Sequence, residues 1–155
     1  PQPTKEELTE RQRIRKELKD TARKELCDGI KEALEKVGRY DKNAHWTFAR
    51  VHDKLNVLIT GETSKQMRAR LSQIIGKDIP PDVLIRDYFP ILELTRYCAA
   101  CRTASYLIES GMNVDAAIEE GARTSLPRGY KPTPIDFREY VWLSGSDSNS
   151  LTGSN

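Results

Sequence analysis

Two cysteines have the spacing of a chemical motif. Cys98 and Cys101 form a C-x-x-C pair, which can be one half of a zinc site or a redox motif. A tetrahedral zinc site needs four ligands, and the sequence places no second cysteine pair or nearby histidine beside this one. The pair also falls inside a predicted helix. We therefore expect both cysteines to be buried core residues, and we expect no metal or other cofactor.

Two histidines are the other obvious candidates for catalysis or metal binding. His45 and His52 lie seven positions apart, close to one face of a predicted helix, but without the H-E-x-x-H spacing or a third ligand. A glycine-rich phosphate loop and a G-x-S-x-G elbow are also missing from the sequence. We expect the histidines to be structural or surface residues and the protein not to be an enzyme, although a site assembled from scattered residues is left open.

Four basic residues form a candidate interaction or DNA-contact face. Lys65, Arg68, Arg70 and Lys77 lie on or just after a predicted helix, the second member of a helix–corner–helix at about residues 46–75. That outline is the one with which a helix enters the major groove of DNA. The alternative is local ion pairing, because acidic residues surround the segment: Glu62, Asp78, Asp82 and Asp87.

The corner itself has strong local signals. An apolar series at helical spacing ends at Gly61, which can adopt the left-handed conformation that closes a helix. Thr63 then offers a hydroxyl to the next helix, and Gln66 follows at the spacing of a capping box. Gly61 and Thr63 are therefore predicted structural residues, between helices at about 43–60 and 64–75.

A longer pattern surrounds this corner. An aromatic-containing helix leads into Gly61 and basic residues, then an Arg-Asp pair, and then a leucine on a helix of small residues. The residues that carry the pattern are Gly61, Ser64, Lys65, Arg68, Arg86, Asp87, Leu94 and the run 98–105. Over about residues 46–111 it resembles the module that follows the DNA-binding domain in phage antirepressors and regulators of the KilA-N and Bro type. The resemblance implies a non-enzymatic module of a phage or prophage regulator that binds another protein, for instance a repressor, and oligomerises. The alternative is a DNA-binding transcription regulator.

The Arg86–Asp87 pair precedes the most apolar predicted helix. We expect Asp87 to cap that helix, and Arg86 or Arg68 to pair with a neighbouring carboxylate. Both members of the pair are therefore assigned a structural role.

The whole pattern predicts an all-α protein of five or six helices around a central helix at about 88–110. We expect one domain, residues 1–143, made of a long helix at about 5–37, a bundle at about 43–122 and a docked segment at 126–143. Gly, Ser, Asp and Asn dominate residues 144–155, which predicts a disordered tail.

The long helix has a thin apolar stripe that includes Leu8, Ile14, Leu18 and Leu26. Because so narrow a stripe buries little surface, we expect these four residues to mediate homo-oligomerisation. Around the stripe the charges alternate in sign, which is typical of a solvated face. A less favoured hypothesis is a phosphate-binding comb of Arg11, Arg13, Arg15, Lys16, Lys19 and Arg23, which acidic residues between them would oppose.

Composition indicates the compartment better than the partner. The net charge of +2 creates no field that would by itself imply nucleic acid or a membrane. Three cysteines without a secretory signal or a long apolar run predict a protein of the cytoplasm, that of the host cell if phage-encoded, with no membrane association. The chain opens on Pro1-Gln-Pro, so we expect it to be processed or excised from a longer protein.

Overall fold

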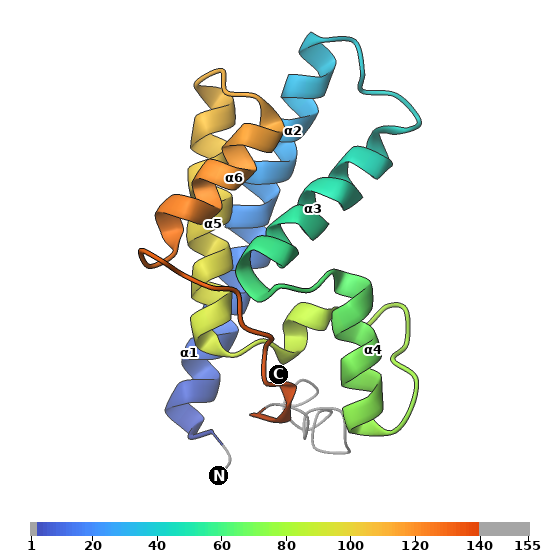
Figure 1. Ribbon diagram of the computed structural model, residues 1–155, viewed down its shortest axis with the longest axis vertical. Helices are drawn as coiled ribbons and strands as arrows, with labels where there is room; N and C mark the ends of the chain where they lie inside the picture. The colour runs from blue at the N-terminus through green and yellow to red at the C-terminus, as the bar shows by residue number, and fades with distance from the viewer. Residues whose placement is uncertain (1–2, 140–155) are drawn as a thin grey trace.

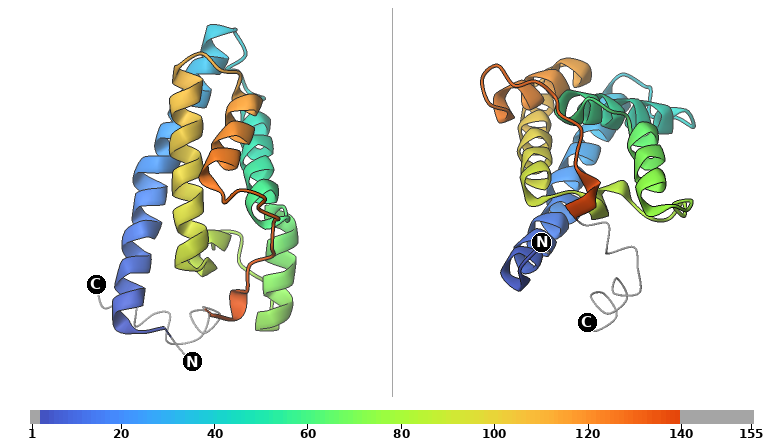
Figure 2. Two further views of the ribbon diagram at one scale, coloured as in Figure 1. Left: turned by 60° about the vertical axis from the view of Figure 1, so that its left-hand side comes forward. Right: turned by 60° about the horizontal axis from the view of Figure 1, so that its bottom comes forward.

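The computed structural model describes residues 3–139, whose regular secondary structure is helical with no strand among them (Figures 1 and 2). The prediction of an all-α fold is confirmed. Six α-helices are labelled in Figure 1: α1 (Lys5–Glu17), α2 (Arg23–Lys36), α3 (Ala44–Thr60), α4 (Ser64–Ile75), α5 (Ile91–Glu109) and α6 (Val114–Ser125). Three short elements complete the order: a π-helical turn η1 (Leu18–Ala22) and the 3-10 turns η2 (Ile85–Tyr88) and η3 (Phe137–Glu139).

The first three elements form one helix of 32 residues, in which η1 is a π turn. The amide of Arg23 donates to the carbonyl of Leu18, an i→i+5 bond that places an extra residue in this turn. Apolar residues recur at every fourth position from Ile14 to Ile30, and that spacing drifts around a regular α-helix. The wider turn offsets part of the drift, so the stripe stays on one side and faces α5.

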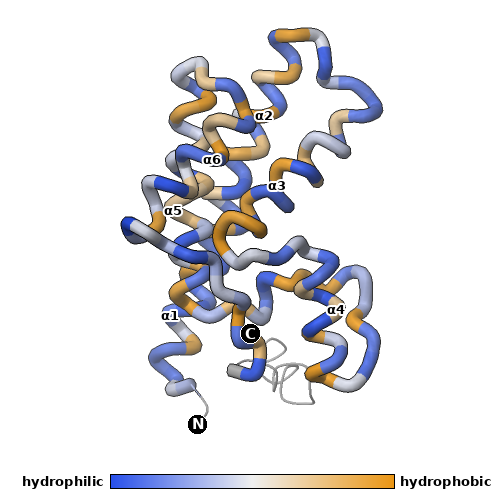
Figure 3. The backbone as a smooth tube through the Cα atoms, in the orientation of Figure 1, coloured by the Kyte–Doolittle hydropathy of each residue, from blue (hydrophilic) through white to orange (hydrophobic). Residues whose placement is uncertain are grey.

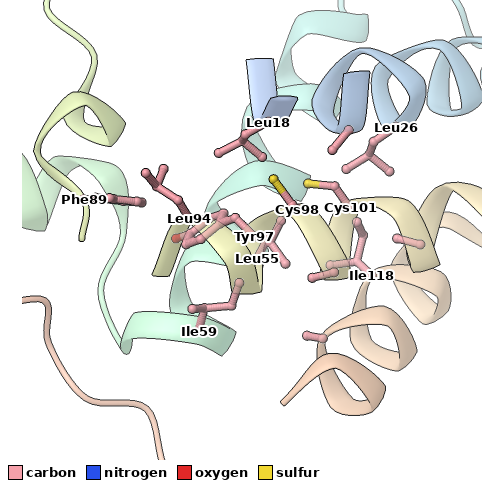
Figure 4. Packing of buried hydrophobic residues seen from close by; sticks show 14 of the residues in the cluster. Leu18, Leu26, Leu55, Ile59, Phe89, Leu94, Tyr97, Cys98, Cys101 and Ile118 are labelled. Carbon is pink, nitrogen blue, oxygen red and sulfur yellow. The ribbon is translucent and has the colours of Figure 1, made fainter. Parts of the chain in front are cut away.

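The core centres on α5. The long helix, α3 and α6 all contact it, and the views in Figure 2 show α2 and α5 running side by side. Leu18 and Leu26 point from the long helix toward Cys98 and Cys101 on α5, while Ile118 approaches from α6 (Figure 4). Small residues on α5 let its neighbours come this close.

Helices α5 and α6 approach each other closely at Gly121. A Cβ atom added there would lie 2.8 Å from the carbonyl oxygen of Ala100 and 3.0 Å from the amide nitrogen of Ala104. Only a residue without a side chain allows the two backbones to pack at this distance.

The corner between α3 and α4 has the predicted chemistry. Gly61 has a φ of 80° and its amide donates to the carbonyl of Val57, while Thr63 and Gln66 form the reciprocal capping box. Helix α4 alternates hydrophobic and hydrophilic residues along its length (Figure 3) and buries Met67 and Leu71. Gly61 and Thr63 thus shape the corner between α3 and α4.

The segment after α6 crosses the bundle as an extended chain. Ile135 and Phe137 are buried, and the hydroxyl of Tyr130 donates to the carbonyl of Ile59. Residues 126–139 therefore lie against the helices. The rest of the predicted docked segment, 140–143, and the predicted disordered tail, 144–155, lie outside the described residues.

Candidate functional site

Arg68, the first candidate on the basic face of α4, is held by backbone carbonyls. Its Nη1 donates to the carbonyl oxygen of Val83 at 2.5 Å and its Nη2 to that of Pro80 at 2.8 Å. The expectation that Arg86 or Arg68 pairs with a neighbouring carboxylate is wrong. The loop after α4 turns back and presents its carbonyls to Arg68, and among residues 3–139 the Arg86 side chain forms no ion pair. This arginine fixes the loop 76–84 against α4.

Arg70 also faces the protein. It forms an ion pair with Glu62 at 2.7 Å, and its guanidinium lies over the ring of Phe137, 4.6 Å from the centroid. Lys65 and Lys77 are exposed. Two of the four predicted contact residues thus have intramolecular roles, and DNA contact by this helix stays a prediction.

Asp87 does not cap the central helix. It lies in η2, and the N-cap position of α5 is occupied by Pro90, with no side-chain cap hydrogen bond. The extended chain at Phe89 carries the helix start away from Asp87, whose carboxylate instead accepts from Arg15 Nε at 3.0 Å. The predicted cap is therefore corrected to a long-range ion pair with the long helix.

The predicted oligomerisation stripe is part of the core of a single chain. Ile14, Leu18 and Leu26 are buried and Leu8 is half-buried. The expectation that a second copy must cover them is wrong, because the small residues of α5 and the π turn let the long helix fold back along its own domain.

Cys98 and Cys101 are both buried and unpaired, which confirms their predicted place in the core. Burial raises the pKa of the Cys98 thiol to about 11 and that of the Cys101 thiol to about 12, so neither carries a reactive thiolate near neutral pH. Within residues 3–139, no group of three or more His, Cys, Asp or Glu side chains could hold a metal ion.

A second thiol lies beside a histidine. Cys27 Sγ on α2 is 3.5 Å from His52 Nε2 on α3. Burial, followed by repulsion from Arg23 and Arg86, lowers the pKa of His52 to about 3, and burial raises the pKa of Cys27. The pair is therefore a neutral thiol against a neutral imidazole, which does not make an activated nucleophile. His45 is exposed, with Nδ1 2.9 Å from the carbonyl oxygen of Lys42.

Three arginines gather near this pair, and we call Arg15, Arg23 and Arg86 the basic cluster. They come from α1, α2 and η2, and each is half-buried. Arg86 Nε and Arg15 Nη1 are buried donors without an acceptor among residues 3–139. Sequence reasoning missed the cluster as a unit. The signal in the sequence was limited to the first two members, which belong to the predicted comb.

Large apolar side chains are exposed at the opposite end of the long helix. They come from the end of α2, the loop 38–43, the first turn of α3 and the α5–α6 turn, all in the upper part of Figure 1: Val37, Tyr40, Trp46 and Met112. Val37 and Met112 together line two adjoining surface grooves. We call these four residues the apolar end surface.

Comparisons with protein-family models, with curated proteins and with solved structures found no match to this chain. In residues 3–139, no helix combines the length and the apolar character needed to cross a membrane.

Proposed function

We propose that this chain is a non-enzymatic interaction module that binds another protein through its apolar end surface. The observation that carries the proposal is the exposure of large side chains: Trp46 is 67% exposed and Val37 is 66% exposed. Aromatic residues and methionine are enriched in protein interfaces, and tryptophan is among the residues that dominate binding energy. Several such residues at one end of a molecule are more typical of an interface than of a solvated surface.

The rim of this surface is polar, as in most interfaces between proteins that also exist apart. Lys31 lies over the ring of Tyr40, 5.2 Å from the centroid, and Arg50 pairs with Asp115 at 2.5 Å beside the grooves. These charges supply orientation, while the apolar side chains supply the surface that partner binding removes from water.

The resemblance to phage antirepressors extends this proposal. On that resemblance the partner is a repressor protein, and the compartment is the cytoplasm of the host cell. The buried stripe Ile14–Leu26 gives no support to self-association through the long helix.

The test compares capture by the wild-type chain with capture by two variants, Trp46→Ser and Leu92→Ser. Leu92 is the matched control, because it is an apolar side chain 54% exposed at the opposite end of the bundle, in the first turn of α5. Each protein is immobilised, exposed to a host extract, and the bound proteins are identified and then titrated individually. We expect Trp46→Ser to weaken binding of the partner by about 2 kcal/mol, which is roughly thirtyfold in Kd. Leu92→Ser should leave the affinity unchanged.

Two outcomes would contradict this function. One is equal binding by the wild type and Trp46→Ser. The other is a wild-type dimer in light scattering that Trp46→Ser converts to a monomer, since the surface would then bind a second copy.

DNA binding is the alternative function, and it makes a different prediction. Titration with random duplex DNA at two salt concentrations should show steeply salt-dependent binding if the α4 face contacts phosphates. Lys65→Gln and Lys77→Gln should then weaken it. We expect no binding near physiological salt, because Arg68 and Arg70 already serve the protein itself.

A further inference from the structure

The basic cluster combines three positive charges with very little compensation. Arg15 Nε has one carboxylate partner, Asp87, at 3.0 Å, and that carboxylate is half exposed to water. Among residues 3–139, the side chains of Arg23 and Arg86 form no hydrogen bond and no ion pair. A guanidinium group carries five donors, so the cluster presents many more donors than acceptors.

The arrangement is energetically costly to the protein alone. Burial, followed by repulsion from Arg23 and Arg15, lowers the pKa of Arg86 to about 10, and burial likewise lowers the pKa of Arg23. Charges taken out of water are normally paired, because unpaired charges lose their hydration without a replacement. In the part of the chain that the structure describes, the two buried side-chain donors that lack acceptors, Arg86 Nε and Arg15 Nη1, belong to the same cluster.

The neighbouring groups do not neutralise these charges. His52 and Tyr97 lie near Arg23 and Arg86, but the imidazole is neutral and the Tyr97 hydroxyl donates to Asn56 Oδ1 at 2.5 Å. The carboxylate of Asp53 on α3 is committed to the amide of Ser64 and to Asn56 Nδ2. Within residues 3–139, no acceptor therefore reaches Arg86 Nε or Arg15 Nη1.

We propose that Arg15, Arg23 and Arg86 bind a phosphate group, carried by inorganic phosphate or by a small phosphorylated molecule. Guanidinium groups donate two parallel hydrogen bonds to the oxygens of phosphate, and several of them can converge on one tetrahedral group. A carboxylate has two oxygens and a single charge, so it would satisfy fewer of these donors. Because the three side chains are half-buried, the site fits a compact anion better than a DNA duplex.

Such an anion would join parts of the fold that are far apart in sequence. Arg15 and Arg23 lie on the long helix, and Arg86 lies in the turn before α5. His52 on α3 is close enough for the charges of Arg23 and Arg86 to lower its pKa. A bound phosphate would thus tie the long helix to the η2 turn and alter the electrostatic environment of α3. This site is separate from the apolar end surface, and neither depends on the other.

The test is a titration of the full chain with sodium phosphate at constant ionic strength. Calorimetry measures the binding, and NMR of the histidine rings measures their pKa values with and without phosphate. Binding neutralises two of the charges that lower the pKa of His52, so phosphate should shift the His52 titration to higher pH. The exposed ring of His45 is the internal control and should not shift. This measurement needs no variant, so it is independent of any folding defect.

Three variants then locate the site. Arg23→Gln and Arg86→Gln should each weaken phosphate binding by about tenfold or more, the usual loss for a hydrogen bond to a charged group. Arg128→Gln, which removes an exposed arginine outside the cluster, should bind phosphate like the wild type. A nucleoside monophosphate that binds more tightly than inorganic phosphate would identify a phosphorylated molecule as the source, and equal affinities would identify the free anion.

Several results would overturn the assignment. The first is an unchanged His52 titration at saturating phosphate, and the second is an equal loss of binding in Arg128→Gln. The third is a shift of His52 by duplex DNA but not by inorganic phosphate, because the cluster would then bind a nucleic-acid backbone.

Discussion

The buried α5–α6 contact and the half-buried basic cluster are built in opposite ways. Where α6 meets α5, small residues bring the backbones together, and Ile118 of α6 is packed into the core. In the basic cluster, long cationic side chains come together with unmet hydrogen-bonding capacity. The first region is satisfied by the chain alone, whereas the second is arranged as a ligand site would be.

This difference predicts how the two regions respond to substitution. Substitutions in the packed region should lower the free energy of unfolding substantially, because a densely packed core relaxes little around a cavity or a steric overlap. Changes in the basic cluster should cost little stability, because removal of a buried charge also removes its unfavourable burial.

The largest effect is expected for Leu26→Ala. Leu26 has no exposed surface and faces α5, so its truncation leaves a cavity that should cost about 2–5 kcal/mol of unfolding free energy. Chemical denaturation measures this. Leu8→Ala, at a half-buried position in the first turns of the same stripe, is the control and should cost less.

Gly121→Ala should follow. The new methyl group would lie 2.8 Å from a backbone carbonyl on α5, and the helices must separate to admit it, at about 1–3 kcal/mol. Alanine has a higher helix propensity than glycine, so propensity alone would raise the stability of the variant. A lower stability would therefore show that close packing dominates. A rise in stability would show that α5 and α6 are not in close contact here.

The third prediction concerns pH and the border of the basic cluster. His52 has a pKa of about 3 in the folded protein and an ordinary value of 6.5 in the unfolded chain, so the unfolded state binds more protons between these values. Stability from this residue is present above pH 6.5 and is lost as the pH falls toward 3, by at most about 1.4 kcal/mol per pH unit. His52→Gln should flatten this dependence in denaturation measured across that range, while His45→Gln should leave it intact.

The smallest effect is expected for Asp87→Ala. Its ion pair with Arg15 is half exposed on the carboxylate side, and such pairs contribute about 0–1 kcal/mol. The melting temperature should change little. A loss well above this range would mean that Asp87 is an essential counter-ion and that the basic cluster is already neutralised by the chain.

The sequence predicted what is encoded locally. The capping box at Thr63 and the left-handed Gly61 depend on residues three or four positions apart, and both were found where the spacing put them. Arg15 and Asp87 are 72 positions apart, and no local pattern indicates that they meet. The capping role expected for Asp87 was inferred from its sequence neighbours, whereas its carboxylate pairs with Arg15, a residue distant in sequence.

The long helix shows the same limit. The number of apolar residues in its stripe predicts too little buried surface to hold the helix on its own domain. That number takes no account of the shape of α5, on which the stripe packs. The small side chains of α5 and the π turn at Leu18–Ala22 let that stripe pack along α5. The sequence pattern of the long helix does not by itself predict this turn. The basic cluster was missed for a related reason, since Arg86 reaches it from a distant turn.

We propose that the apolar end surface binds a partner protein and that the packed core around α5 needs no second copy to cover it. The most direct test is amide hydrogen exchange of the chain alone and in complex with the captured partner. We predict that partner binding slows exchange in residues 37–47 and 111–113 and leaves residues 64–77 unchanged. Slowed exchange confined to residues 64–77, or to the long helix before residue 30, would contradict this account.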